Sequence, residues 1–440
     1  MLLHVIDPTQ RDSILDLAKA NGYDTEVHPD NPHSLTLTPT STVKPDFSPD
    51  FVGTVLFDHN DSSQQNKFKP RCTTPKKLET NEARGLPTQY FLPPDIYNTY
   101  NFPPASNSIT PNVCIVELGG GFSTSDLQYY WKTYLGYPTN GYPTVRTVGI
   151  DGATNNPSRG NTPGDADYEV SLDIQVIGGL FPNGKVNIYV YFAPNTDQGF
   201  YDAFQSAIYN TVTPFTAISC SWGGPEDSWG NSTLTAYDQL FAQAVHKGIT
   251  IFAASGDNTS SDGESGLHVD FPASSPNAIG CGGTKLVCPN RVYASTTTHE
   301  TVWYNSSSEG TGGGYSSFFS APSFQISALT GSSLATSHRA VPDVAGNADP
   351  NSGWLIYIKG ELYIVGGTSA VAPMWTALWT LTTEATGRTF AGPLLYNLRG
   401  TSSFNDNIPG NNGAYSFVPK YDLCTGLGTP NGKTIKSNAR

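Results

Sequence analysis

The sequence has little positive charge. Its 440 residues contain 24 Lys and Arg against 37 Asp and Glu, which gives a formal net charge of −13 at pH 7. A surface of this sign repels phosphate groups, so we expect no nucleic-acid partner and no anionic membrane partner. Charged residues of both signs make up only 14% of the chain, while Gly and Pro number 44 and 33. This composition favours a loop-rich globular protein over a coiled coil or a disordered chain.

Several sequence features of other protein classes are missing. No stretch is long and apolar enough to span a membrane. Residues 1–7 lack the basic and long apolar regions of a signal peptide, so the cellular compartment stays open. The six cysteines are not spaced as zinc ligands. We expect Cys114 and Cys220 to be buried thiols, and Cys281 and Cys288 could form a disulfide across a short loop.

The pattern of apolar residues divides the chain into three parts. Residues 1–70 are expected to form a small α+β unit, with a helix over residues 11–21 and a hairpin over residues 24–38. Residues 71–88 lie in a polar linker, where a protease could cut. From residue 89 to residue 440, strand and helix patterns alternate, which predicts an α/β domain with a mostly parallel sheet between helices.

Within this larger domain, the buried strands end in glycine-rich loops. A helix is predicted over residues 168–177, ending at Gly178 and Gly179. Functional groups of open parallel sheets gather beyond the carboxyl ends of the strands. The predicted strands of this kind span residues 112–118, 186–192, 216–222 and 249–254.

Ser369 lies in a setting that suits a nucleophile. It follows two glycines and precedes a helix pattern over residues 370–383. The N-terminus of a helix presents free N–H groups and a positive dipole end. An attacking serine needs such donors, because it creates an oxyanion beside them. The alternative is a serine that caps an ordinary turn, which this short motif alone favours.

A base for this serine is not found among the histidines. None of the eight histidines lies in a glycine-rich loop at a strand end, and no His-Gly-Thr sequence occurs. Glu169 and Asp173 are instead four residues apart on one face of a predicted helix. A proton shared between close carboxyl groups raises one pKa, so Glu169 could accept the serine proton at acidic pH. The alternative is a solvated acidic first turn that the helix dipole favours.

Asp257 is the third candidate group. It follows the apolar strand over residues 251–254, in the sequence Ser-Gly-Asp. A protonated carboxyl at this place could donate a hydrogen bond to an oxyanion. The alternative is an aspartate that forms an Asx turn after a strand.

Several short segments occur in a fixed order from about residue 87 to the C-terminus. They are Glu169-x-x-x-Asp173 and residues 219–224, 253–257, 312–316, 339–344 with 348–350, 366–370 and 421–430. Together they resemble the segments of the sedolisins, the serine-carboxyl peptidases. The resemblance implies a subtilisin-like three-layer α/β fold with a sheet of about seven mostly parallel strands.

This resemblance implies a role for each candidate residue. Ser369 would be the nucleophile and Glu169 the general base, while Asp173 would orient and tune Glu169. Asp257 would be the oxyanion acid, with the backbone N–H of Ser369 as the second donor. The family hydrolyses peptide bonds of proteins and peptides at acidic pH.

The resemblance also implies one structural calcium ion, bound within residues 400–432. Carboxylates and backbone carbonyls suit calcium, which takes oxygen ligands in a flexible cage. Here an asparagine separates the Asp and the Ile that are usually adjacent, and two usual glycines are replaced, so a metal-free loop is the alternative. The ligands carried over are Asp406, Asn407, Val418, Lys420 and Asp422.

The N-terminal unit over residues 1–70 resembles part of the family's prodomain. It is shorter than usual, so that an initial strand and helix would be missing. Such a segment assists folding and inhibits the enzyme intramolecularly until it is removed, and we expect self-cleavage at low pH between about Cys72 and Gln89. We expect a monomer, and the resemblance suggests an extracellular or acidic compartment.

Three functions are compatible with these features. The leading one is a self-processing serine-carboxyl peptidase that acts at acidic pH. The others are a catalytically inactive relative that only binds, and a subtilisin-like peptidase that works near neutral pH. A binding protein needs none of the four candidate residues, and a pH profile separates the two peptidases. No motif distinguishes an endopeptidase from a tripeptidyl-peptidase.

Overall fold

The computed structural model describes residues 67–78, 86–106, 109–160, 164–293, 296–384 and 386–439 in continuous stretches. Before Lys67 it describes four strands and residues 15, 16 and 19, which are helical as predicted. The rest of the helix predicted over residues 11–21 lies outside the described residues. The four strands are β1 (Leu2–Val5), β2 (Tyr23–His28), β3 (Asn31–Pro39) and β4 (Thr54–Phe57).

These four strands form an antiparallel sheet in the order β2-β3-β1-β4. The hairpin predicted over residues 24–38 is confirmed as β2 and β3. β1 was not predicted, although it lies between β3 and β4 in this sheet. Its four residues are too short a run to show an alternating pattern, and its place in the sheet comes from pairing with strands distant in the sequence.

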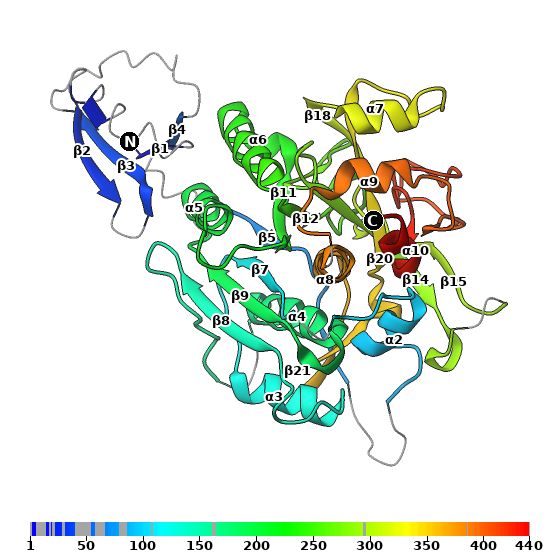
Figure 1. Ribbon diagram of the computed structural model, residues 1–440. Helices are drawn as coiled ribbons and strands as arrows, with labels where there is room; N and C mark the ends of the chain where they lie inside the picture. Colours follow the sequence, from blue (N-terminus) through cyan, green and yellow to red (C-terminus); the bar gives the residue numbers. More distant parts are fainter. Residues whose placement is uncertain are drawn as a thin grey trace.

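A mostly parallel sheet of eight strands runs through the body of the molecule (Figure 1). Seven strands follow the order β15-β14-β12-β10-β7-β9-β8, and β20 pairs parallel with β14. β15 runs antiparallel to β14, and the other pairs on the path are parallel. The predicted fold class is confirmed. The strands are β7 (Asn112–Glu117), β8 (Thr144–Gly149), β9 (Asn187–Phe192), β10 (Ala217–Cys220), β12 (Thr250–Ala254), β14 (Ile279–Val287), β15 (His299–Val302) and β20 (Val344–Asn347).

Alternate side chains of the central strands serve two separate cores. In β7, Val113 and Ile115 belong to one buried cluster, whereas Cys114 and Val116 belong to the other. Successive side chains of a strand point to opposite faces, so both faces of this sheet are apolar and both need a cover of helices. The helices of the first cluster are α2 (Pro93–Thr99), α3 (Thr124–Thr133), α4 (Asp165–Leu180), α8 (Val371–Thr383) and α10 (Gly432–Asn438), together with two short helices over residues 323–329 and 391–397, and those of the second are α5 (Asp197–Ile208) and α6 (Asn231–His246).

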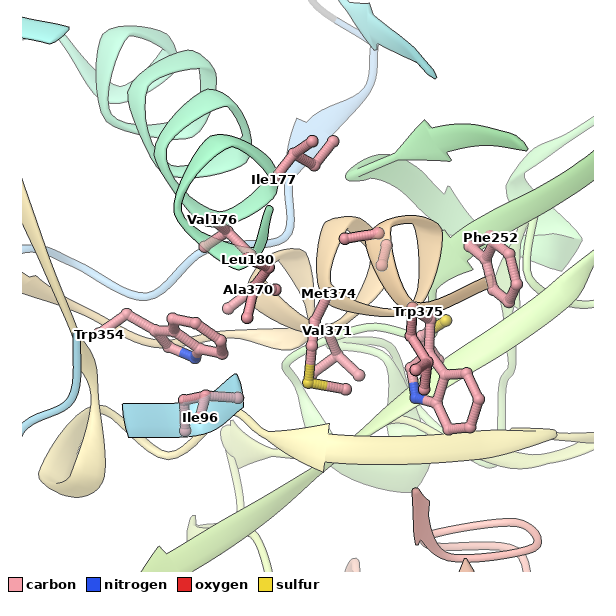
Figure 2. Close-up of a cluster of buried hydrophobic side chains, with 14 of the residues drawn as sticks. Ile96, Val176, Ile177, Leu180, Phe252, Trp354, Ala370, Val371, Met374 and Trp375 are labelled. Atoms are coloured by element: carbon pink, nitrogen blue, oxygen red, sulfur yellow. The ribbon is translucent and has the colours of Figure 1, made fainter. Parts of the chain in front are cut away.

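Helix α8 is buried along its whole length. Its side chains are apolar apart from four threonines, as suits a helix that is enclosed on all sides, and it packs against α4, β10 and β12. Figure 2 shows Val176 and Leu180 of α4 near Ala370 at the start of α8, and these side chains belong to one core cluster. This packing holds the start of α8, with Ser369 just before it, close to α4.

The remaining described elements surround this framework. None of the described helices is long and apolar enough to cross a membrane. The helices are α7 (Ser323–Leu329) and α9 (Ala391–Asn397). The strands are β5 (Lys69–Pro70), β6 (Lys76–Lys77), β11 (Trp222–Pro225), β13 (Asp270–Phe271), β16 (Tyr304–Ser306), β17 (Glu309–Gly310), β18 (Gly314–Ser320), β19 (His338–Val341), β21 (Trp354–Ile358), β22 (Glu361–Val365), β23 (Phe404–Asn405) and β24 (Thr429–Pro430). Short 3₁₀ turns span Pro182–Gly184, Glu226–Ser228, Thr259–Ser261, Pro289–Arg291, Pro350–Ser352 and Thr368–Ala370.

Helix α4 continues past the point where its end was predicted. Gly178 and Gly179 lie inside the helix, which runs to Leu180. A Cβ atom at Gly179 would lie 2.6 Å from the ring of Pro93, and one at Gly178 would lie 3.2 Å from the indole of Trp131. The two glycines therefore allow α2 and α3 to pack closely on α4, and they do not end the helix.

The cysteines of the structure are free thiols. Cys114 and Cys220 are buried, as predicted. The possible disulfide between Cys281 and Cys288 is wrong, because Cys281 lies within β14 and Cys288 directly follows its last residue. An extended strand rises about 3.3 Å per residue, which places the two far beyond the Cα separation of about 7 Å that a disulfide allows.

Candidate active site

Ser369 lies at the turn between β22 and α8. Gly367 has a φ of +107°, a left-handed conformation that suits glycine. A Cβ atom at this position would overlap the backbone oxygen of Arg71 and would lie 2.6 Å from Oδ2 of Asp257. Glycine is therefore required here so that a peptide carbonyl and the Asp257 carboxyl can both approach the turn that carries Ser369.

Ser369 is hydrogen-bonded to a carboxyl group. Its Oγ donates to Oε2 of Glu169 at 2.9 Å. Asp173, one turn further along α4, accepts from Oγ of Ser221 at 2.9 and 3.0 Å through its two oxygens. All four side chains are fully buried. The structure thus brings Ser369, Glu169 and Asp173 together, and it adds Ser221 as a partner that holds Asp173.

Three carboxyl groups share this buried region. Burial raises the pKa of Glu117, Glu169 and Asp173 well above their usual range, and the negative charge of Asp173 raises the pKa of its two neighbours further. Close buried carboxyl groups cannot all ionise, so they hold protons jointly. Oε1 of Glu169 is buried without a hydrogen-bond donor, and a proton shared with Asp173 would supply one.

Asp257 lies beside Thr368, the residue before Ser369. The backbone N–H and the hydroxyl of Thr368 both donate to Oδ1 of Asp257 at 2.8 Å. The second oxygen, Oδ2, is buried without a donor. Burial raises the pKa of Asp257 to about 7, against the lowering effect of the Thr368 hydrogen bonds and the Arg71 cation. Because Oδ1 is occupied as an acceptor, a proton on this carboxyl belongs on Oδ2.

Residues 67–78 lie directly across Ser369. β5 pairs antiparallel with β11, and β6 pairs antiparallel with β22. Between them, the N–H of Arg71 donates to the carbonyl of Ser221 at 2.8 Å, and the N–H of Ser369 donates to the carbonyl of Arg71 at 2.8 Å. The predicted oxyanion donor therefore holds a peptide carbonyl from the chain's own N-terminal side.

The described histidines lie apart from this arrangement. Within the part of the chain whose side chains are described, no histidine is hydrogen-bonded to Ser369 or Glu169. His268, for example, pairs with the exposed carboxyl of Asp227 at 2.6 Å. The hydrogen bond of the serine hydroxyl to a carboxyl replaces the imidazole that the alternative neutral-pH peptidase requires.

The sequence motifs contained Ser221 and Thr368 but did not assign them a function. Both are short hydroxyl residues in segments quoted for the family resemblance. Ser221 follows the last residue of β10, so the rule that functional groups gather beyond strand ends was a signal for it. Thr368 had no such signal, because its partner Asp257 is 111 residues away in the sequence.

The five residues predicted to bind calcium lie in two neighbouring loops. Asp406 accepts from the N–H of Lys420 through Oδ2, and its buried Oδ1 has no partner. Burial raises the pKa of Asp422 to about 6, and the negative Asp406 raises it as well. Asn407 and Val418 are exposed. Over the described residues, no three or more His, Cys, Asp or Glu side chains are grouped as metal ligands.

Comparison with known proteins identifies relatives of this chain. The sequence model of the subtilase family matches residues 147–390. The chain is 42% identical over 379 residues to kumamolisin of Bacillus sp. (strain MN-32), covering 83% of this chain and 66% of that protein. It is 30% identical over 407 residues to sedolisin of Pseudomonas sp. (strain 101), covering 86% of this chain and 66% of that protein.

A solved structure agrees with these relatives. The structure of Pseudomonas sedolisin, a serine-carboxyl proteinase complexed with two molecules of pseudo-iodotyrostatin, superimposes with a TM-score of 0.68 at 28% identity. The match covers 79% of this chain and 97% of that one. This chain belongs to the subtilase family and, within it, to the sedolisins, which confirms the resemblance. It spans 66% of the length of each of the two curated relatives.

The raised pKa values of the buried carboxyl groups predict how the stability of the fold changes with pH. Their pKa values are raised by folding above the ordinary 4.5 of Glu and 3.8 of Asp, and Asp257 reaches about 7. A raised pKa stabilises the fold fully below the ordinary value, and this contribution is lost as pH rises through the folded value. We expect the urea midpoint of Ser369→Ala, which prevents self-digestion, to decrease from about pH 4 to about pH 7.

Adding Asp173→Asn to the same background should make this decrease smaller, because one of the coupled carboxyls is removed. Glu264→Gln, at an exposed position, serves as the control and should leave the pH dependence unchanged. A pH dependence that is identical with and without Asp173 would contradict the assignment of raised pKa values to this cluster.

Proposed function

We propose that this protein is a serine-carboxyl peptidase that hydrolyses peptide bonds of proteins and peptides at acidic pH and processes its own precursor. The hydrogen bond from Oγ of Ser369 to Oε2 of Glu169 carries the proposal. It supports a carboxylate, tuned by Asp173, as the base that activates the serine.

In the first step, Oγ of Ser369 attacks the carbonyl carbon of the substrate while Glu169 accepts the hydroxyl proton. The carbonyl oxygen becomes an oxyanion. The N–H of Ser369 and a proton on Oδ2 of Asp257 are the donors for it. The carbonyl of Arg71, 2.8 Å from the N–H of Ser369, marks where such an oxygen would bind.

In the second step, Glu169 gives its proton to the leaving amine, the C–N bond breaks, and an acyl-enzyme ester on Ser369 remains. Water then attacks this ester while Glu169 again accepts a proton. The bond between Oγ of Ser369 and the acyl carbon breaks, the proton on Glu169 returns to Oγ, and the acid product leaves. Asp173 shares the proton that Glu169 gains. The negative charge that remains on the pair is therefore spread over two carboxyl groups.

The two alternatives are less well supported. A neutral-pH peptidase needs an imidazole base, and the described histidines make no hydrogen bond to Ser369. A protein that only binds has no need for a serine hydrogen-bonded to a buried carboxyl, and burying three carboxyl groups together costs stability. The arrangement therefore favours catalysis.

The first test is the pH dependence of activity. Asp257 loses its proton as pH rises through about 7, and the oxyanion then loses one donor. We expect kcat/KM to fall as pH rises through this range. Glu169→Gln removes the group that accepts the serine proton, so we expect it to lower kcat by about 10³-fold or more. The measurement is hydrolysis of a quenched fluorescent peptide between pH 3 and pH 8, and a maximum above pH 7 would refute a carboxyl base.

Self-processing is tested by comparing the full chain with Ser369→Ala at about pH 4. We expect the wild-type chain to convert to a shorter form, as followed by intact mass, and the variant to remain whole. If the cleavage is intramolecular, its rate should not change on tenfold dilution. Equal conversion of the two proteins would rule out self-processing.

We also propose that Asp406 and Asp422 hold one structural calcium ion together with backbone carbonyls of their loops. Two neighbouring carboxyl groups, of which Asp406 raises the pKa of Asp422 and has a buried oxygen lacking a donor, fit a hard cation. When bound, the ion would neutralise this negative charge and join the two loops.

Calcium should raise the melting temperature of Ser369→Ala, because a ligand at about 100 times its Kd adds about 2.7 kcal/mol to stability. The readout is thermal unfolding with 1 mM CaCl₂ or with EDTA, which is independent of activity. Asp406→Asn should abolish the difference, whereas Asp227→Asn, at an exposed site, should retain it. Identical curves in calcium and EDTA would contradict the proposal.

A further inference from the structure

The segment bound across Ser369 indicates which peptides the site prefers. We propose that the site is an endopeptidase site that cuts after arginine and favours an aromatic residue three positions before that arginine. The bond cut in the precursor is then Arg71–Cys72. This inference rests on the proposed peptidase function and adds its substrate specificity.

The backbone of the segment defines which bond faces the serine. Pro70 and Lys69 pair antiparallel with Trp222 and Gly223, as a substrate strand would. The next residue, Arg71, binds the carbonyl of Ser221 through its N–H and the N–H of Ser369 through its carbonyl. The carbonyl that lies at the oxyanion donor belongs to Arg71, so the bond that follows it is the one presented for cleavage.

The side chain of Arg71 occupies a buried acidic pocket. Its exposed fraction is 4%, and Nη2 lies 3.2 Å from Oδ2 of Asp262 and forms an ion pair with Asp270. Both carboxylates are completely buried. One nitrogen of the guanidinium therefore interacts with two buried carboxyl groups at once. Burial raises the pKa of both groups and the Arg71 cation lowers it, so the cation favours their charged form, which a neutral side chain cannot do.

The pocket leaves its two carboxylates little freedom. A Cβ atom at Gly223 would overlap Oδ1 of Asp270, and one at Gly256 would lie 2.8 Å from Oδ1 of Asp262. Backbone thus packs directly against both acids. Two close buried carboxylates repel each other, and among the described residues Arg71 is the lysine or arginine that pairs with them. When the segment leaves, the arginine of a substrate restores this charge balance.

A second pocket binds Phe68. Its ring is 2% exposed, stacks on Trp229 with centroids 4.5 Å apart, and lies 5.0 Å from the ring of Phe200. Asn195 holds the backbone at this position, accepting from the N–H of Phe68 at 2.9 Å and donating to its carbonyl at 2.8 Å. A large aromatic side chain fills this pocket, which a small one would leave empty.

The chain continues past this second pocket. Lys67 still contacts the enzyme body, with Nζ 2.9 Å from Oδ1 of Asp197. A tripeptidyl-peptidase must stop the substrate at the third residue before the cut, whereas here the fourth and fifth residues are bound. The side chain of Lys69, at the third position, is exposed and is not selected. The site therefore binds a stretch inside a polypeptide chain and not only its first three residues.

The test uses peptides with the sequence of residues 67–76, with serine in place of Cys72 and with both ends blocked. The enzyme is the full chain after incubation at about pH 4. We expect cleavage after the arginine position. Replacing that arginine by citrulline, which has the same shape without the charge, should lower kcat/KM about 100-fold or more. Replacing the phenylalanine by alanine should lower it about tenfold or more.

A peptide with Gln in place of Lys69 is the matched control, because it also loses one positive charge but at an exposed position, and it should react within about threefold of the parent. A second arm tests the pocket itself. Asp270→Asn should reduce the preference for arginine over citrulline at least about tenfold without a matching loss on the citrulline peptide. Asp227→Asn should keep the full preference.

The outcomes separate this inference from the proposed function. Casein cleavage that Ser369→Ala abolishes, combined with equal rates for the arginine and citrulline peptides, would overturn the specificity and leave the peptidase function standing. Failure of the wild-type protein to cleave any substrate would overturn both. A processed chain whose N-terminal sequence begins at Cys72 supports the assigned bond, and one that begins elsewhere overturns that assignment.

Discussion

The structure depends on carboxyl groups that are buried together with too few cations to balance them. Glu117, Glu169 and Asp173 lie in one region where burial and repulsion oppose ionisation, so they cannot all ionise and hold protons jointly. Holding a shared proton lowers the stability of the fold at neutral pH. It also allows a carboxyl group to exchange a proton with a serine under acidic conditions. The same condition keeps Asp257 neutral below about pH 7 and lets it act as a hydrogen-bond donor.

The fold provides the rigid frame that this arrangement needs. Helix α8 is enclosed on all sides and begins just after Ser369, and α4 carries Glu169 and Asp173 on the face that meets it. Because both helices pack on one face of the parallel sheet, the turn that carries Ser369 is held against the face of α4 that carries Glu169 and Asp173. Residues 67–78 cross this frame through two short antiparallel pairings, with the carbonyl of Arg71 bound to the N–H of Ser369.

Much of this could be predicted from the sequence, since it depends on local patterns. The alternation of strands and helices indicated the parallel sheet, and the four candidate residues lie in short motifs whose chemistry is recognisable. The function of Asp262 and Asp270 could not be assigned in this way, because it depends on their contact with Arg71, which is 191 residues from Asp262. Gly178 was interpreted as a helix end because glycine usually marks one, while in the folded chain it makes room for Trp131.

The central claim is that neutral carboxyl groups persist in this site at a pH where ordinary carboxyls are ionised. Carbon-13 NMR of the side-chain carboxyl carbons, in protein labelled at Asp and Glu, measures this directly in Ser369→Ala between pH 3 and pH 8. The account predicts a signal, missing in the Asp257→Asn variant of the same protein, that titrates near pH 7. If every carboxyl carbon has finished titrating by about pH 5, the account is contradicted.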